Sequence, residues 1–244
     1  MLLAESLDDD IDGIENSIDQ CPNSKITDIV DENGCSVEEL SYPVEHHFDI
    51  TLGYGYTQFD SNTSQSAQSF SFAYYYGEAL SFLFYTSNYD LDSGENGVDD
   101  STFQVSYMKE YHDTYLGFSL GAYLPTFDIP DNKTDYFLKL SATKELADID
   151  ITTSYQYTMM QDTLTQNTNY LELSFGGTPI EELYTSLSYT IQDSIYKDEG
   201  TLQYASLYTH YPINDIFFID TSFSMGLNTQ AVKNSFQLSL GYSY

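Results

Sequence analysis

The last ten residues of the chain, SFQLSLGYSY (residues 235–244), alternate strictly between polar and apolar side chains. Successive side chains of an extended strand point to opposite faces, so this segment predicts a β-strand with one polar and one apolar face. The apolar face would consist of Phe236, Leu238, Leu240, Tyr242 and Tyr244. The residues between them, such as Ser239 and Gly241, are small or polar and would form the opposite face.

The same alternation recurs upstream as far as His47, in segments of about ten residues, which is typical of strands that cross a membrane as a barrel. The sequence predicts an all-β fold for residues 46–244: an antiparallel transmembrane β-barrel of about twelve strands. A soluble β-sandwich or a β-solenoid would show the same alternation, so periodicity alone does not decide between them. The expected strands lie near 47–58, 67–77, 79–89, 101–111, 113–124, 134–144, 147–159, 168–177, 181–192, 200–210, 215–227 and 233–244.

The connections between these segments alternate in length, which favours the barrel. Short turns are expected at 77–78, 110–113, 144–146, 177–180 and 211–214. The other connections are longer and polar, for example SNTSQSAQ and DLDSGENGVDD. Bacterial barrels have short periplasmic turns and longer external loops, so both termini are predicted to be periplasmic. The 24 Tyr and 15 Phe residues also suit the aromatic girdles of an outer-membrane barrel.

The charge balance limits the partners of the protein. It carries 38 acidic residues against 7 basic ones, all of them lysine, for a net charge of -31. This charge argues against nucleic acid and against an anionic membrane surface, while cations and the cation-bridged leaflet of a bacterial outer membrane are compatible. No apolar run approaches the roughly 18 residues of a membrane helix. A barrel must be exported, and MLLAES is too short for a signal, so we expect one upstream or already removed.

Residues 1–45 lack strand periodicity and form a separate acidic segment. Asp8, Asp10, Asp12, Ile14 and Asp19 occupy positions 1, 3, 5, 7 and 12 of a calcium loop of the EF-hand type, with Gly13 at position 6. Alternate carboxylates would converge on the ion, and Ile14 would contribute its backbone carbonyl. The spacing predicts a calcium site, although Asp replaces the usual Glu at the last position. A solvated acidic tail is the alternative.

Cys21 and Cys35 are the two cysteines of the chain. In an exported protein such a pair predicts a disulfide. A zinc site would need two further ligands, and none lies nearby in the sequence.

The segment DDDIDGIENSIDQCPNSKITDIVDENGC resembles a thrombospondin type 3 repeat of the kind found in OmpA-family proteins. In that family the repeat is a calcium-stiffened periplasmic linker between a barrel and a peptidoglycan-binding domain. Here it precedes the barrel and no such domain follows it in this sequence, so the resemblance implies a spacer and not an anchor to the cell wall. The matching residues are Asp8, Asp10, Asp12, Gly13, Asp19, Cys21, Pro22, Val30, Asp31, Gly34 and Cys35.

The polar residues at alternate positions of each strand would face the interior and line it with small polar side chains and a few charged ones. The inward candidates are Asp49, Glu110, Lys139, Asp148, Asp150, Glu172, Glu182 and Asp220. Because twelve strands enclose more room than eight, this lining predicts a narrow, water-filled pore that favours cations. A closed polar core without conduction is the alternative.

The sequence predicts no enzyme. Four histidines, His46, His47, His112 and His210, fall beside short turns and are expected to be solvated at the periplasmic rim. No general base therefore lies near an external nucleophile. Two functions remain: a channel for small cationic or neutral solutes, or a structural barrel that anchors the calcium-stiffened segment to a partner protein. Phe236–Tyr244 resembles the terminal signal read by the barrel-assembly machinery, so that machinery and outer-membrane lipid are expected partners.

Overall fold

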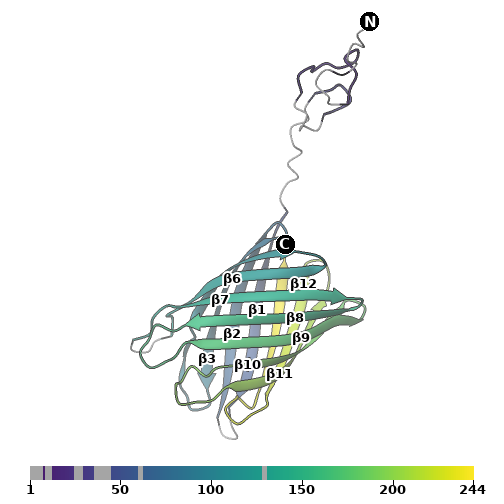
Figure 1. Ribbon diagram of the computed structural model, residues 1–244. Helices are drawn as coiled ribbons and strands as arrows, with labels where there is room; N and C mark the ends of the chain where they lie inside the picture. Colours follow the sequence, from purple (N-terminus) through teal and green to yellow (C-terminus); the bar gives the residue numbers. More distant parts are fainter. Residues whose placement is uncertain (1–7, 9–12, 25–29, 36–44, 60–62, 128–130) are drawn as a thin grey trace. The chain divides into compact units, whose positions relative to one another are not determined.

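The computed structural model describes residues 8, 13–24, 30–35, 45–59, 63–127 and 131–244. The chain divides into two compact units, Met1–Val44 and Glu45–Tyr244 (Figure 1). No helix of the described residues is long and apolar enough to span a membrane.

The second unit consists of antiparallel β-strands. The strands are β1 (His46–Gln58), β2 (Ser64–Tyr76), β3 (Leu80–Leu91), β4 (Asn96–Val98), β5 (Ser101–Glu110), β6 (Thr114–Leu124), β7 (Asp135–Leu146), β8 (Ile149–Met159), β9 (Thr168–Ile180), β10 (Leu183–Gln192), β11 (Leu202–Pro212), β12 (Phe217–Gly226) and β13 (Asn234–Ser243). The predicted second strand thus begins earlier than expected, at Ser64, and takes up part of the polar SNTSQSAQ stretch.

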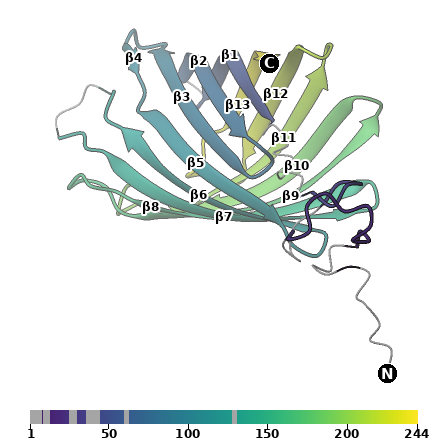
Figure 2. The same cartoon turned by 90° about the horizontal axis from the view of Figure 1, so that it is seen from above.

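The twelve long strands close into a ring. Each one pairs with its neighbours in chain order, β3 pairs with β5, and β1 pairs with both β2 and β13. Short β4 pairs with β3 and lies outside the ring as an extension of the β3–β5 connection. In Figure 2, β7 and β8 lie on the wall opposite β1, β2 and β13. The predicted twelve-stranded antiparallel barrel is confirmed.

The connections alternate between short turns and longer loops around the ring, as predicted. The short turns are residues 77–79, 111–113, 147–148, 181–182 and 213–216, and they lie at the same end of the barrel as His46 and Tyr244. We call this the short-turn end. The opposite, long-loop end carries residues 59–63, 92–100, 125–134, 160–167, 193–201 and 227–233.

Two predicted turns are wrong in position. Residues 144–146 and 177–180 belong to strands, because β7 runs to Leu146 and β9 to Ile180. The true turns use left-handed backbone at Ala147 (φ 57°) and Glu182 (φ 69°), residue types that carry no turn signal. Gly177 pairs with Thr185, and a register shift between Leu183 and Thr185 absorbs the irregularity near Pro179.

The large apolar side chains lie on the outer surface of the barrel, and the polar side chains lie inside it. The outward parity exposes large apolar residues, among them Leu187 (58% exposed), Leu120 (54%) and Leu240 (52%). The buried residues of the described chain are instead mostly serine, threonine and aspartate. A soluble protein rarely exposes so large an apolar surface, whereas the lipid-facing wall of a membrane barrel requires one. The outward parity therefore fits hydrocarbon and the inward parity fits water.

The first unit contains the predicted disulfide. Cys21 and Cys35 are joined, with a Cα–Cα distance of 4.9 Å. Two hydrogen bonds tie the same two segments together: the Gln20 backbone N–H donates to the Asn33 carbonyl (2.9 Å), and the Ser24 hydroxyl donates to the Gly34 carbonyl (2.6 Å). The covalent link and these bonds hold residues 20–24 against residues 33–35.

Candidate functional site

The strand register identifies which side chains face the lumen. Thr51 of β1, Ser71 of β2, Tyr208 of β11 and Asp220 of β12 line one cavity, although β2 and β11 are separated by three strands. Residues that are paired across neighbouring strands point to the same face of the sheet. The inward-facing residues of one strand therefore identify those of the next, all the way around the ring. The parity places Asp49, Glu110, Lys139, Asp150, Glu172 and Asp220 on the inner wall.

The remaining two predicted lumen residues lie in turns and not on strands. Asp148 belongs to the β7–β8 turn and Glu182 to the β9–β10 turn, both at the short-turn end. The structure brings Glu182 together with Asp49 and Asp220 around one cavity. Asp148 and Asp150 border a second hollow beside Gly177. Glu110, Lys139 and Glu172 lie apart from these groups on other strands.

Inward tyrosines are the feature that the sequence analysis missed, since it assigned tyrosine to the lipid-facing girdles. The sequence does distinguish them, because each falls at the same alternate positions of its strand as the small polar residues. Tyr204 and Tyr208, for example, lie on the same face as Ser206. They are Tyr75, Tyr85, Tyr89, Tyr115, Tyr123, Tyr170, Tyr184, Tyr204 and Tyr208.

Tyrosine hydroxyls supply hydrogen bonds to the lumen carboxylates. The Tyr208 hydroxyl donates to Asp220 Oδ1 (2.8 Å), and the Tyr170 hydroxyl donates to Glu172. A hydroxyl satisfies a carboxylate oxygen without cancelling its charge, unlike an arginine or a lysine. These hydrogen bonds therefore hold the two carboxylates in place and bring no positive charge to them.

The inner wall carries more negative charge than the sequence analysis expected. Asp135 and Glu145 share the inward parity of Lys139 on β7, and neither was predicted. Lys139, between Ser119 and Gln156 on the flanking strands, is the one lysine at an inward position of the thirteen described strands. A low-dielectric wall focuses the field of such charges into the space that it encloses.

Several inward aromatic rings lie close over glycines of the neighbouring strand. A Cβ atom added at Gly241 would overlap the Phe218 ring, one added at Gly176 would overlap Tyr184, and one added at Gly121 would overlap Phe137. Glycine lets a ring cover the backbone of the next strand, a pairing known to support β-sheets. These glycines therefore let the rings lie close to the barrel wall.

Replacing Gly241 by alanine is expected to push the Phe218 ring off the wall, at a cost of about 1–3 kcal/mol in the free energy of unfolding. Because the nearest atoms to the added Cβ all belong to that ring, Phe218→Ala should relieve the clash. Urea unfolding of the two single variants and the double variant in lipid vesicles measures the coupling. Strictly additive losses would contradict the proposed contact.

The histidines lie near the short turns and have partners: His46, His47 and His112 are exposed, and His210 is partly exposed. His210 Nδ1 lies 2.8 Å from Asp220 Oδ1, on the inner wall. His46 is hydrogen-bonded to the Tyr74 hydroxyl (2.6 Å). The His47 ring stacks on Tyr75 with centroids 4.1 Å apart, and the His112 ring stacks on Tyr111.

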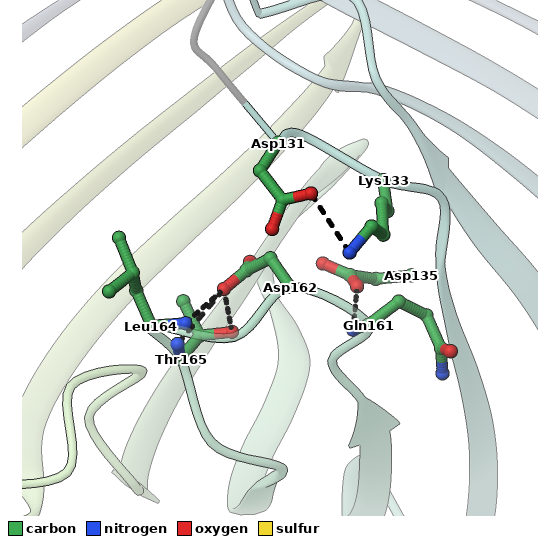
Figure 3. Close-up of polar contacts among 7 residues, drawn as sticks. All are labelled: Asp131, Lys133, Asp135, Gln161, Asp162, Leu164 and Thr165. Carbon is green, nitrogen blue, oxygen red and sulfur yellow. Dashed lines mark hydrogen bonds and ion pairs between the residues drawn. The ribbon is translucent and has the colours of Figure 1, made fainter.

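Polar contacts tie two loops together at the long-loop end (Figure 3). Asp135 accepts a hydrogen bond from the Gln161 backbone N–H (2.6 Å), which joins the start of β7 to the β8–β9 loop. Asp162 accepts bonds from the Leu164 and Thr165 backbone and from the Thr165 hydroxyl. Partial burial acts to raise the pKa of Asp162, but these bonds and Lys133 hold it below its usual value. This carboxylate therefore stays ionised and anchors its loop.

The described part of the predicted calcium loop contains carboxylate oxygens that could bind a cation. Asp8 Oδ2 accepts a hydrogen bond from the Gly13 backbone N–H (2.9 Å), and Gly13 has a left-handed φ of 95°. Asp19 Oδ1 accepts one from the Cys21 N–H (2.7 Å), whereas Asp19 Oδ2 is buried and has no hydrogen-bond partner. Buried carboxylate oxygens normally have partners, so this one fits a metal ligand.

Asp10 and Asp12 lie outside the described residues, and Ile14 lies within them. Among the described residues alone, no three His, Cys, Asp or Glu side chains gather closely enough to hold a metal. Nearby Asp31 accepts hydrogen bonds from the backbone N–H groups of Asn33 and Cys35 (2.8 and 3.2 Å), which lower its pKa. Asp31 therefore braces the disulfide-closed turn in its ionised form.

Solved outer-membrane channels share the fold of this chain. An outer-membrane channel from Pseudomonas putida F1 superposes with a TM-score of 0.64 at 14% identity, covering 85% of this chain and 99% of that one. The NanC porin gives a TM-score of 0.58 at 9% identity, with 80% and 98% covered. The KdgM porin in complex with disordered oligogalacturonate gives 0.57 at 10% identity, with 80% and 99% covered. The sequence matches no protein-family model and no curated protein.

Proposed function

We propose that this chain is a porin-like channel of a Gram-negative outer membrane that passes small cationic or neutral solutes. Both termini would lie in the periplasm, at the short-turn end. The observation that carries the proposal is the inner wall: its strands present carboxylates and tyrosines, with Lys139 as the one lysine among the described inward positions. The shared fold of solved porins and channels supports the same class of function.

The wall chemistry explains why cations would pass more readily than anions. Glu172 accepts a hydrogen bond from the Tyr170 hydroxyl, which orients its charge without neutralising it, whereas Asp220 is held by both the Tyr208 hydroxyl and His210. A cation entering the lumen exchanges part of its hydration shell for carboxylate and hydroxyl oxygens, whereas an anion meets repulsion. Neutral solutes would be limited by size alone.

Reconstitution in planar bilayers tests the proposal. Under a potassium chloride gradient, the reversal potential should have the sign of a cation-selective pore. Screening should weaken this selectivity as the salt rises from about 0.1 M to 1 M, because the Debye length falls from roughly 10 Å to 3 Å. A correctly folded protein that stays silent over a wide voltage range, or that prefers chloride, would refute the channel.

A second function is favoured by the first unit: a barrel that anchors a calcium-stiffened periplasmic segment for docking to a partner protein. The unpaired, buried Asp19 Oδ2 and the Cys21–Cys35 disulfide support it. Asp8, Asp10, Asp12, Asp19 and the Ile14 carbonyl would hold the ion, whose role would be to draw the carboxylates together and stiffen the loop.

Limited proteolysis of the full chain tests the calcium part of this proposal. Calcium should slow cleavage within residues 8–35, and a chelator should restore it. Asp19→Asn is expected to abolish the protection because it removes a carboxylate ligand, whereas exposed Glu32→Gln should retain it. Equal cleavage with and without calcium in the wild type would count against the site. The docking role fails if pull-downs recover the same proteins after removal of residues 1–45.

A further inference from the structure

A cavity of about 710 Å³ opens into the lumen at the short-turn end. Side chains of β1, β2, β11 and β12 line it, together with residues of the β11–β12 turn and of the β9–β10 turn. Its volume falls within the roughly 300–1,000 Å³ typical of small-molecule sites. Strands distant in the sequence contribute charged and aromatic groups to this space.

The charge of this cavity is strongly negative. Its lining includes the carboxylates of Asp49, Glu182, Asp215 and Asp220, and no lysine. His210 is its one basic side chain, and that group is already paired with Asp220 at 2.8 Å. No basic group lines the cavity beside Asp49, so this charge is left for a ligand to neutralise.

Asp49 differs from the other three carboxylates in its surroundings. Its Oδ1 atom is buried and has no hydrogen-bond partner. The Tyr75 hydroxyl interacts with the same carboxylate. A carboxylate that is partly removed from water and lacks a cationic partner is costly, and a bound cation would offset that cost. This unsatisfied group points to a positively charged ligand.

The walls of the cavity are aromatic and apolar, which discriminates between kinds of cation. Tyr75, Tyr208 and Phe218 line it, and its rim includes Ile213 and Ile216. A contact fixes the position of each ring. Tyr75 stacks on His47, the Tyr208 hydroxyl donates a hydrogen bond to Asp220, and Phe218 packs over Gly241. Fixed aromatic rings beside a carboxylate attract ammonium groups through cation–π interactions. A strongly hydrated metal ion gains little from such walls.

We infer that the short-turn end of the lumen contains a binding site for a small organic ammonium ion. Asp49 is its counter-ion, and Tyr75 and Tyr208 form its aromatic wall. The inference rests on the proposed passage of cations, and it names organic amines as the class of solute that the channel would retain during passage.

Calorimetry on the folded full chain in detergent micelles tests this site with choline as the probe. The control ligand is the uncharged alcohol in which carbon replaces the choline nitrogen, so the two differ in charge at equal shape. Choline should bind at least about tenfold more tightly, as expected for a desolvated cation–π and carboxylate site. Equal affinity for the two compounds overturns the inference, as does complete displacement of choline by an equal concentration of potassium.

Variants assign the binding to the named residues. Asp49→Asn and Tyr208→Leu should each weaken choline binding about tenfold, while Tyr208→Phe keeps the ring and should retain most of the affinity. The control is Asp198→Asn, an exposed carboxylate of the β10–β11 loop at the other end of the barrel. A heat-modifiable gel shift checks that each variant is folded. Wild-type affinity in both Asp49→Asn and Tyr208→Leu would remove the site from this cavity.

Bilayer recordings separate this inference from the proposed channel function. Choline should shorten the open time of single channels more strongly when added on the short-turn side. A cation-selective channel that binds choline no better than its uncharged analogue would refute the amine site alone. A silent protein that still prefers choline tenfold would refute the channel and leave the site standing.

Discussion

Deletion of Tyr244 is expected to lower the amount of folded barrel in the outer membrane by roughly tenfold or more. Tyr244 forms the last pair of hydrogen bonds at the seam where β13 meets β1: its N–H donates to the Phe48 carbonyl (3.0 Å), and the Phe48 N–H donates to its carbonyl (2.8 Å). A backbone hydrogen bond contributes about 0.5–1.5 kcal/mol, so losing this pair can reach the roughly 1.4 kcal/mol that a tenfold loss needs. The ring of Tyr244 also lies 5.6 Å from that of Phe48.

The same deletion would remove the final aromatic residue of the proposed assembly signal, Phe236, Leu238, Leu240, Tyr242 and Tyr244. Heat-modifiable mobility in purified outer membranes measures the folded fraction. Tyr244→Phe keeps both the backbone bonds and the ring, so it should insert normally. Removal of residues 8–19 should also leave insertion nearly unchanged, because the strands of the barrel remain intact. Equal losses from the two deletions would refute a special role for the C-terminal residue.

Neutralising the lumen carboxylates should abolish most of the cation preference of the channel. In the triple variant Asp49→Asn, Glu172→Gln and Asp220→Asn, the inner wall keeps its shape but loses three negative charges on β1, β9 and β12. Charged, low-dielectric clefts raise counter-ion concentration by about tenfold or more, and this enrichment should fall toward one. The measurement is the reversal potential under a salt gradient at low ionic strength.

Two controls test whether the position and the sign of the removed charge determine the change in selectivity. The triple variant Glu95→Gln, Asp131→Asn and Asp198→Asn removes the same charge from exposed loops at the long-loop end and should change selectivity little. Lys139→Gln should act in the opposite sense and increase the cation preference, because it removes the inward lysine. Selectivity that follows total charge, whatever its position, would contradict a lumen origin.

Much of the fold could be predicted because strand periodicity is a local property. The alternation in residues 235–244 is written in adjacent residues, and the paired strands confirm it: Leu238 and Leu240 face outward, while Gln237 and Ser239 face inward. The same holds for the disulfide, since the chain offers one pairing for its two cysteines. The turn at Glu181–Glu182 escaped prediction because its left-handed residue is Glu182, while Gly177 and Pro179 imitate a turn nearby.

The sequence alone therefore determined the all-β class, the number of strands, the inward and outward parity and the excess of acidic groups, because each depends on neighbouring residues or on composition. Tertiary structure decided what those residues do together. Asp49 and Tyr208 meet at one cavity only because β1 and β13 close the ring and set its register. Ring closure joins segments distant in the chain, and no local pattern records which side chains it brings face to face.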